Sequence, residues 1–392
     1  MRRSVVALSS RLASSFKPCT STLSTSSSLN VVLGSTVSSK RNLFITTVFL
    51  RGPPPMDLIK QLRVETDAPL GQCRKALEES GNDISKAKEW LRQKGLQTAA
   101  KKSSRTTQEG VIGMQQLGNE RSVLLEVNSE TDFVLNSDKF KEVIDECLDQ
   151  LVKFKPSQNE LSVEQNEQAF ESEIVSNSAI FGGSSSIKEK FNELVAILRE
   201  NVKPRRVKYL VNTNTIEQQL AGYLHNSKGE KIGGVASFVI VKAVPGSNKT
   251  PEQLQSLGRQ IAMHICGMGP NYLTKEQVPA EVVQHERDLL LKRLEEQQAE
   301  EKQKAEQEGK EYKPKSQDIL NKMIDGQLNK QFLSDQVLLL QPWVLDQKMT
   351  VQQFCKDSGI EIIDFVRMKV GEGMQYKPKK SFAEEVAEQV KV

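Results

Sequence analysis

One order of residue patterns occurs twice in this sequence, and it constrains the fold more than any other feature. In the first copy, two apolar runs at 111–114 and 122–127 flank a Gly-Asn turn and precede a helical pattern at 139–152. The second copy repeats this order at 223–225, 235–242 and 251–266. Apolar runs joined by tight turns are typical of antiparallel hairpins. The repetition therefore predicts two related α/β subdomains with antiparallel sheets.

Smaller parts are predicted around these subdomains, giving an α+β fold. Residues 56–100 read as a three-helix module that is similar to ubiquitin-associated (UBA-like) domains, and residues 279–336 as a projecting helical hairpin. The predicted ranges are 1–55 for a transit peptide and linker, 56–100 for the module, 106–203 for the first core subdomain, 204–278 with 337–375 for the second, 279–336 for the hairpin, and 376–392 for a C-terminal tail.

Local signals predict several boundaries inside these parts. Gly95 is expected to stop the third helix of the module, since glycine commonly ends helices. The polar, Ser-rich stretch 153–187 is expected to be a flexible insertion in the first subdomain. The β-branched run 360–370 predicts a strand, and 382–390 a short amphipathic helix.

The first 55 residues have the composition of an organelle-targeting segment. They contain no Asp or Glu, seven Lys or Arg and thirteen Ser, which is typical of a transit peptide. The early arginines favour the mitochondrial matrix, while the Ser and Thr content leaves a plastid open. A secretory signal on the apolar run 43–50 would start too far from Met1. Without this segment, 47 of the 54 Lys and Arg residues remain beside 50 Asp and Glu residues, so the net charge becomes about −3. A chain with this charge has no general electrostatic attraction to nucleic acid.

The residue patterns of common catalytic and metal sites do not occur in the sequence. The five cysteines form no C-x-x-C pair, and none of the three histidines lies in an H-E-x-x-H spacing. There is no phosphate loop, no G-x-G-x-x-G after a strand and no G-x-S-x-G elbow. No run of about 18 apolar residues occurs, which excludes a membrane channel. We therefore expect a binding protein without catalytic residues, metal or cofactor, in which cysteines serve packing.

Six short motifs occur in a fixed order along the chain. They are residues 59–84, 125–134, 200–206, 261–265, 341–344 and 370–373. In this order they closely resemble elongation factor Ts, the guanine-nucleotide exchange factor of the GTPase elongation factor Tu. The resemblance covers about 56–375, and it is the combination that is specific, because the segment 131–134 alone would not be. It implies elongation factor Tu as the partner, with no direct binding of nucleotide, membrane or nucleic acid.

The resemblance also implies roles for individual residues. Thr131, Asp132, Phe133 and Val134 match the segment that intrudes beside the partner's magnesium site. Phe133 would wedge between two partner helices, and Asp132 would act on the loop that holds the ion. The positions that match partner contacts are Arg63, Leu70, Gly71, Arg74, Lys102, Ile232, His264, Val344 and Leu345. Leu70-Gly71 replaces a bulkier apolar pair common in bacterial members, so that contact is expected to be weaker.

Alternative interpretations remain for the same residues. On local pattern alone, Asp132 would cap a helix and Phe133 would be core. His264 is as consistent with the edge of the core as with an interface, and Arg205-Arg206 with a solvated strand start. Two other functions stay open: an RNA- or ribosome-associated scaffold, and a ubiquitin-type adaptor acting through the helical module. A steep salt dependence of RNA affinity would indicate the scaffold.

Overall fold

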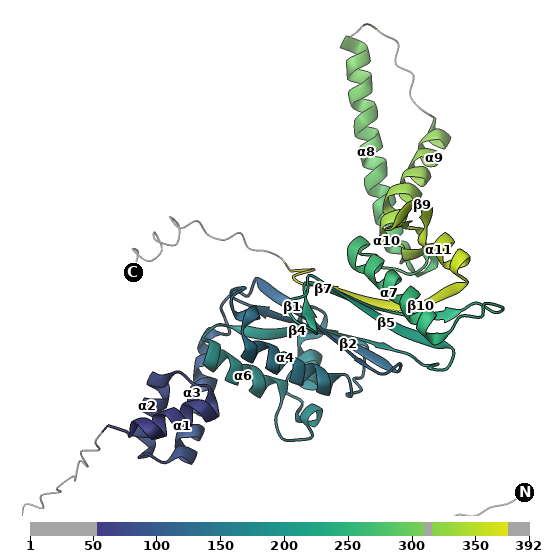
Figure 1. Cartoon of the computed structure of the whole chain (residues 1–392). Helices are drawn as coiled ribbons and strands as arrows, with labels where there is room; N and C mark the ends of the chain where they lie inside the picture. Colours follow the sequence, from purple (N-terminus) through teal and green to yellow (C-terminus); the bar gives the residue numbers. More distant parts are fainter. Residues whose placement is uncertain (1–52, 308, 310–315, 375–392) are drawn as a thin grey trace, which may run out of the picture. The chain divides into compact units, whose positions relative to one another are not determined.

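The computed structural model describes residues 53–307, 309 and 316–374 (Figure 1). The predicted transit peptide, except for its last three residues, lies outside this range. So do the predicted tail 376–392 and its expected helix at 382–390. The elements below therefore concern the described residues only.

The N-terminal module consists of three helices. They are α1 Met56–Thr66, α2 Leu70–Ser80 and α3 Ile84–Lys102. Local signals set their ends as expected: Pro69 precedes α2, Gly81 ends it with a left-handed φ of 66°, and the Asp83 side chain accepts a hydrogen bond from the Lys86 N–H at the start of α3. A small core that includes Leu62, Cys73 and Leu77 fills the space between the helices.

Gly95 does not end α3, so that prediction is wrong. The helix continues to Lys102 with Gly95 in its interior. A Cβ atom at Gly95 would lie 3.1 Å from the Cβ of Ala196, a residue of helix α6. The glycine therefore allows two helices to approach closely, which is a second use of glycine besides helix termination.

The first sheet has five antiparallel strands in the order β3-β4-β2-β1-β6. These strands are β1 Glu109–Leu117, β2 Arg121–Ser129, β3 Glu160–Ser162, β4 Val202–Val211 and β6 Ile232–Gly233. β4 crosses the predicted boundary at 203/204. Because β4 pairs with β2 and β3, it belongs to the first subdomain, and the predicted boundary is wrong.

A second antiparallel sheet has the order β10-β7-β5. Its strands are β5 Gln218–His225, β7 Val235–Ala243 and β10 Ile360–Lys369. β10 is the strand expected from the β-branched run. A separate two-stranded ribbon is formed by β8 Pro342–Trp343 and β9 Asp346–Thr350.

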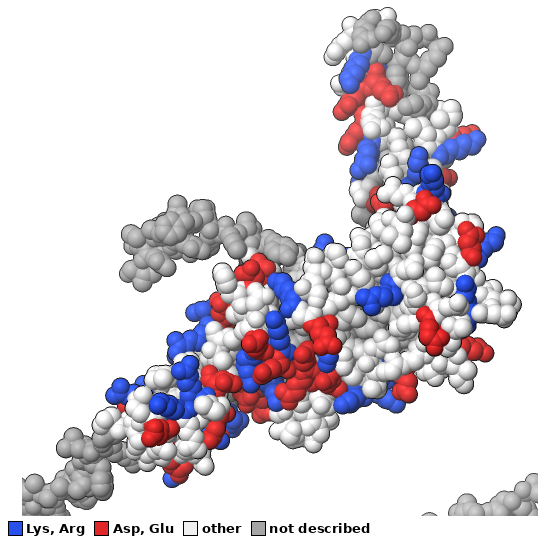
Figure 2. All heavy atoms as spheres, in the orientation of Figure 1, with Lys and Arg blue, Asp and Glu red and all other residues white. Residues whose placement is uncertain are grey.

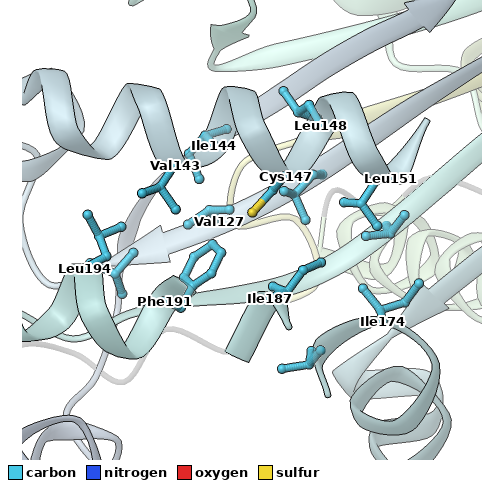
Figure 3. Packing of buried hydrophobic residues seen from close by; sticks show 14 of the residues in the cluster. Val127, Val143, Ile144, Cys147, Leu148, Leu151, Ile174, Ile187, Phe191 and Leu194 are labelled. Atoms are coloured by element: carbon cyan, nitrogen blue, oxygen red, sulfur yellow. The ribbon is translucent and has the colours of Figure 1, made fainter. Parts of the chain in front are cut away.

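Helices cover one face of each sheet, and the two remaining faces share a core. On the first sheet lie α4 Asp138–Leu151 and α6 Ile187–Leu198 (Figures 1 and 3). On the second lies α7 Pro251–Met268, with α11 Val351–Ser358 beside it. A further buried cluster joins the sheets: Ile112, Leu124, Leu210, Leu220, Ala236, Phe238, Ile240 and Met368. This arrangement explains why strands such as β2 are buried on both faces.

The stretch 153–187 is structured, so the predicted flexible insertion is wrong. Besides β3 it forms α5 Val163–Phe170, a π-helical turn η2 Glu171–Val175 and a 3-10 turn η3 Ser178–Phe181. Phe170 and Ile174 are buried in the same core as α4 and α6, and Figure 3 shows Ile174 facing it. A few apolar residues spaced among many polar ones are thus sufficient to fix the segment.

Residues 280–307 and 316–340 form the helical hairpin and its return to the second sheet. α8 Ala280–Gln307 and α9 Gln317–Gln327 pack together through a cluster that includes Leu290, Leu294 and Ile324. The remaining turns are η4 Lys275–Gln277, η5 Leu328–Leu333, α10 Ser334–Gln336 and η6 Leu338–Leu340. None of the described helices combines the length and the apolar character needed to cross a membrane.

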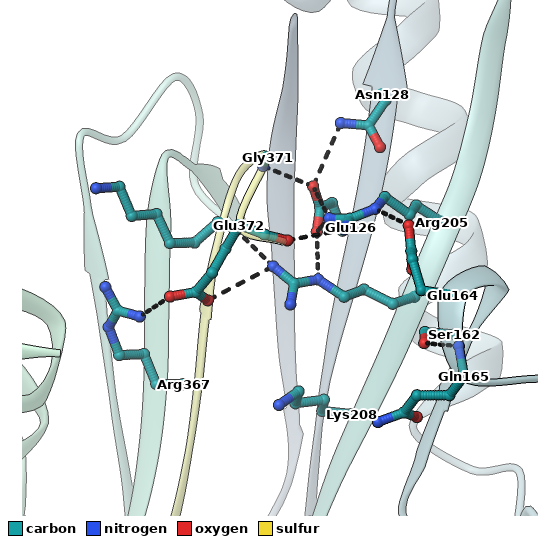
Figure 4. Close-up of polar contacts among 12 residues, drawn as sticks. Glu126, Asn128, Ser162, Glu164, Gln165, Arg205, Lys208, Arg367, Gly371 and Glu372 are labelled. Carbon is teal, nitrogen blue, oxygen red and sulfur yellow. Dashed lines mark hydrogen bonds and ion pairs between the residues drawn. The ribbon is translucent and has the colours of Figure 1, made fainter. Parts of the chain in front are cut away.

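A buried ion cluster connects the first sheet with the chain that follows β10 (Figure 4). The carboxylate of Glu126 on β2 binds the guanidinium groups of Arg205 and Arg206 and the Gly371 N–H. Glu126 is fully buried, and the two arginines are 5% and 8% exposed. The alternative interpretation of Arg205-Arg206 as a solvated strand start is therefore wrong, because their charge is neutralised inside the protein.

Candidate functional site

The segment 131–134 follows directly on β2 and presents one large apolar side chain to solvent. Phe133 is 81% exposed, whereas Val134 and Leu135 are buried in the core of the first subdomain. The 3-10 turn η1 Val134–Asn136 follows Phe133, and Ser137, not Asp132, caps the start of α4. The alternative in which Phe133 is core and Asp132 a helix cap is therefore wrong.

The base of this segment is fixed by hydrogen bonds. The Glu200 carboxylate accepts bonds from the Thr131 N–H at 3.2 Å and from the Thr131 hydroxyl at 2.8 Å. Val134, buried at the other end, anchors the segment by packing. The side chain between these anchors is an exposed aromatic one, although exposed aromatic rings are unfavourable in water. Such an arrangement is suited to insertion into another molecule.

Four of the predicted contact residues in the N-terminal module lie at its surface. Arg63, Leu70, Gly71 and Arg74 are exposed, and Leu70 is 43% exposed at the first position of α2. Apart from its own helix backbone and chain neighbours, nothing lies within 4 Å of the place where a Cβ of Gly71 would be. Arg74 makes an exposed ion pair with Glu78 at 2.9 Å, a pair that contributes little and leaves the guanidinium able to rearrange.

Lys102, also predicted as a partner contact, is half-buried and engaged within the chain. Its ammonium group donates a hydrogen bond to the carbonyl of Arg199, the residue that ends α6. Burial lowers the pKa of Lys102, and the neighbouring Arg105 charge acts in the same direction. In this structure Lys102 therefore ties the end of α3 to the turn that carries Glu200.

Val344 and Leu345 form the turn between β8 and β9, and both are accessible. They are 39% and 62% exposed. Behind them, the ring of Trp343 stacks between His264 and Phe354, with centroid distances of 5.1 and 4.1 Å. The Val344 N–H donates to His264 Nδ1 at 3.2 Å. The turn thus exposes two apolar side chains and is supported from beneath by stacked rings and a hydrogen bond.

Ile232 and His264 are interior residues, unlike the other predicted contacts. Ile232 is 2% exposed and His264 is fully buried. Neither side chain is accessible to a partner in this conformation, so the prediction of direct contact is corrected for both. His264 instead supports the Val344 turn, because its imidazole accepts the N–H of that residue.

The hydrogen bonds of His264 favour its neutral form. Gln341 donates through its amide nitrogen to the Asp335 carbonyl, so its oxygen faces His264 Nε2 at 2.9 Å and requires a proton there. Nδ1 then accepts from Val344 and has no room for a second proton. Burial lowers the pKa of His264, although the bond to Gln341 opposes this effect.

The lowered pKa of His264 should make the stability of the protein depend on pH. Well above about pH 6.5, His264 is neutral in both folded and unfolded chains. As the pH falls below this value, the unfolded chain takes up a proton that the folded chain binds less readily, so stability decreases. We expect the wild type to lose more stability than His264→Gln between pH 7.5 and 5.5, measured by urea unfolding. Equal losses would contradict the assignment.

The described cysteines are buried, and the described residues show no candidate metal site. No cluster of three or more His, Cys, Asp or Glu side chains there is arranged to hold a metal ion. Cys73, Cys147, Cys266 and Cys355 are buried and unpaired, and burial raises the pKa of Cys147 to about 12 and of Cys266 to about 11. Such thiols are protonated and unreactive at neutral pH.

The face shown in Figure 2 has no continuous basic surface among its described residues. On the face shown in Figure 2, acidic side chains gather over α4, and basic ones are scattered among them. The acids on α4 include Glu142, Asp145, Glu146 and Asp149. An RNA-binding face would require a continuous basic surface.

Sequence reasoning did not single out Glu200, which holds the exposed segment. The available signal was its place in the motif 200–206, one of the six used for the resemblance. Nothing in the local sequence shows that this carboxylate meets Thr131, a residue 69 positions earlier.

A comparison with protein-family models agrees with the motif order. The model described as "Elongation factor TS" matches residues 130–372, well over half of the chain. The match includes the segment 131–134, Glu200 and the β8–β9 turn, but it begins after the N-terminal module. The chain belongs to the elongation factor Ts family.

Proposed function

We propose that this protein is a mitochondrial elongation factor Ts. It binds GDP-bound elongation factor Tu, promotes release of GDP by disturbing the magnesium site, and so allows GTP to bind again during organellar protein synthesis. Family membership supports a nucleotide-exchange role and implies elongation factor Tu as the partner. The observation that carries the mechanism is Phe133, 81% exposed on a segment that is fixed at both ends.

The energetics of such a mechanism are feasible. A nanomolar complex of a GTPase with GDP corresponds to about −12 kcal/mol. Accelerating release by about 10⁴ requires roughly 5.5 kcal/mol of selective stabilisation of the opened state. Burial of one Phe side chain supplies about 1.5–3 kcal/mol. Disturbance of a magnesium ion, which proteins hold through few ligands of their own, would supply the remainder.

Binding of this chain and binding of GDP to the partner must weaken each other. By linkage, the factor by which this chain weakens GDP binding equals the factor by which GDP weakens binding of the chain. The chain itself then needs no active site, and it acts by differential binding to two states of the GTPase.

The other exposed residues support a broad docking surface. Leu70, Val344 and Leu345 are accessible apolar side chains, and Arg63 and Arg74 are accessible cations. In the proposal these residues provide affinity, while Asp132 and Phe133 act on the magnesium site. Ile232 and His264 contribute from the interior by shaping the surface above them.

The exchange activity can be tested directly. Mitochondrial elongation factor Tu is loaded with fluorescent GDP, and release is followed in excess unlabelled GDP with and without the chain. We expect a large acceleration that saturates with the concentration of the chain. A GTPase outside the translational group serves as the control and should not respond. An unchanged release rate from elongation factor Tu would refute the proposed function.

The organelle is tested separately, because it rests on the composition of the first 55 residues alone. A fluorescent protein carrying residues 1–55 should accumulate in mitochondria. Replacing the early basic residues Arg2, Arg3 and Arg11 by Gln should leave it in the cytosol, since import signals of this type depend on positive charge. Accumulation in plastids would contradict the mitochondrial assignment.

A further inference from the structure

Side chains continue the pairing of β2 and β4 beyond the last backbone pair. That last pair is Ser129 with Val202. In an antiparallel register the next pairs would be Glu130 with Asn201 and Thr131 with Glu200. The Asn201 N–H donates to the Glu130 carboxylate at 2.6 Å, and the Thr131 N–H donates to the Glu200 carboxylate at 3.2 Å. A regular ladder has backbone bonds only at alternate pairs, whereas here a side-chain carboxylate accepts an N–H at both adjacent pairs and holds the two strand ends together.

Thr131 is held by hydrogen bonds at each of its polar groups, two residues before the exposed Phe133. Its hydroxyl donates to Glu200 at 2.8 Å, in addition to the bond from its N–H. Its carbonyl accepts the Ser129 hydroxyl at 2.7 Å. Hydrogen bonds to a charged acceptor are stronger than those between neutral groups. All three polar groups of Thr131 are thus engaged, and Asp132 and Phe133 follow immediately.

The turn that carries Glu200 is itself tied down. Arg199 adopts a left-handed φ of 60° at the end of α6, and its carbonyl accepts the Lys102 ammonium group. The Asn201 amide donates to the Arg105 carbonyl at 2.8 Å, and Arg105 pairs with Glu130 at 3.3 Å. The carboxylate of Glu200 is therefore presented by a fixed turn, not by a free loop.

We propose that Glu200 is a positioning residue for nucleotide exchange. Through Thr131 it sets the direction in which Phe133 leaves the sheet, so that the aromatic ring is already placed for insertion when the partner binds. This inference rests on the proposed exchange function. Its physical basis is preorganisation, since a segment that is ordered beforehand loses less conformational freedom on binding.

The test uses the full chain in the GDP-release assay, with the maximal rate and the half-saturating concentration measured separately. Glu200→Ala is expected to lower the maximal rate about tenfold or more, with little change in the half-saturating concentration, because the other contacts remain. Glu200→Gln retains one acceptor and should lose less. Thr131→Val, which replaces the hydroxyl by a methyl group, should have a maximal rate between those of Glu200→Ala and the wild type. Thr131→Ser keeps the hydroxyl and should have nearly the wild-type rate.

A double substitution separates positioning from a general structural effect. If Glu200 acts through Phe133, then Glu200→Ala should lower the rate in the wild type and cause no further loss in Phe133→Ala. Glu167→Ala, which changes an exposed carboxylate on α5 of the same subdomain, is the matched control and should behave as wild type.

The outcomes distinguish the inference from the function on which it rests. If Glu200→Ala leaves the maximal rate unchanged, or lowers it equally in both backgrounds, the positioning role is refuted while the exchange function stands. If the wild-type chain does not accelerate release at all, both are refuted.

Discussion

Replacing Phe133 by alanine is expected to slow the stimulated release of GDP about ten- to a hundredfold, which corresponds to losing the roughly 1.5–3 kcal/mol gained by burying the ring. The substitution should change the free energy of unfolding by no more than about 0.5 kcal/mol, because changes at exposed positions usually have small effects. Phe133 is 81% exposed. A loss of activity without a loss of stability would place the effect in the complex. The measurements are fluorescent GDP release and urea unfolding of the same samples.

A second exposed apolar residue provides the control for this prediction. Ile216, in the turn between β4 and β5, is 91% exposed, and no motif or predicted contact includes it. Ile216→Ala should therefore leave both exchange and stability unchanged. Undiminished exchange by Phe133→Ala would show that the ring does not act on the partner. Equal losses in both variants would indicate a general effect of surface hydrophobicity instead.

The repeated hairpin–helix order could be predicted because its signals are local. Apolar alternation, a Gly-Asn turn at 118–119 and helix-capping residues such as Asp83 depend on neighbours a few residues away. They give the correct type of element and close ends, except that the strand predicted at 223–225 begins earlier, at Gln218. The segment 131–134 with its exposed Phe133 was identified differently, through the order of six motifs, because its local pattern favours a buried phenylalanine.

The failed predictions involve distant partners. Gly95 has the signature of a helix end, but Ala196, about a hundred residues later, makes it a contact point between helices. Phe170 and Ile174 lie in a polar stretch, and their burial depends on α4 and α6. The burial of Ile232 and His264 likewise depends on how the elements assemble. In each case the deciding interaction is tertiary, and single-sequence patterns do not contain it.

Arg205 and Arg206 illustrate the same limit in more detail. Consecutive residues of a regular strand point to opposite faces, so both could not meet one carboxylate. The register of β2 and β4 shifts here: Glu126 pairs with Arg206, and Val127 pairs with Pro204. Arg205 is the extra residue of a β-bulge, which allows both guanidinium groups to turn toward Glu126. A bulge of this kind has no local sequence signal.

Replacing Glu126 by alanine is expected to destabilise the protein by about 3–5 kcal/mol, because it removes the only fully buried carboxylate among the partners of Arg205 and Arg206. The only carboxylates that the two guanidinium groups then keep are the partly exposed ones of Glu164 and Glu372. Arg205 binds Glu126 at 2.9 Å, and Arg206 also donates to the same carboxylate. The Gly371 N–H, 2.8 Å from Glu126 Oε1, would lose its acceptor as well. Glu126→Gln keeps the size and one acceptor, so its loss should be smaller. Urea unfolding measures both.

A surface ion pair on the same sheet tests whether burial causes the large destabilisation expected for Glu126→Ala. Glu160 on β3 pairs with Lys208 on β4 at 3.0 Å, with side chains 38% and 22% exposed. Removing this carboxylate by Glu160→Ala should cost no more than about 1 kcal/mol. The same charge change on the same sheet would then have a several-fold smaller effect in water than inside the protein. If Glu126→Ala cost as little as Glu160→Ala, the arginines would have found solvent or new partners, and the link from β2 to the chain after β10 would not depend on this carboxylate.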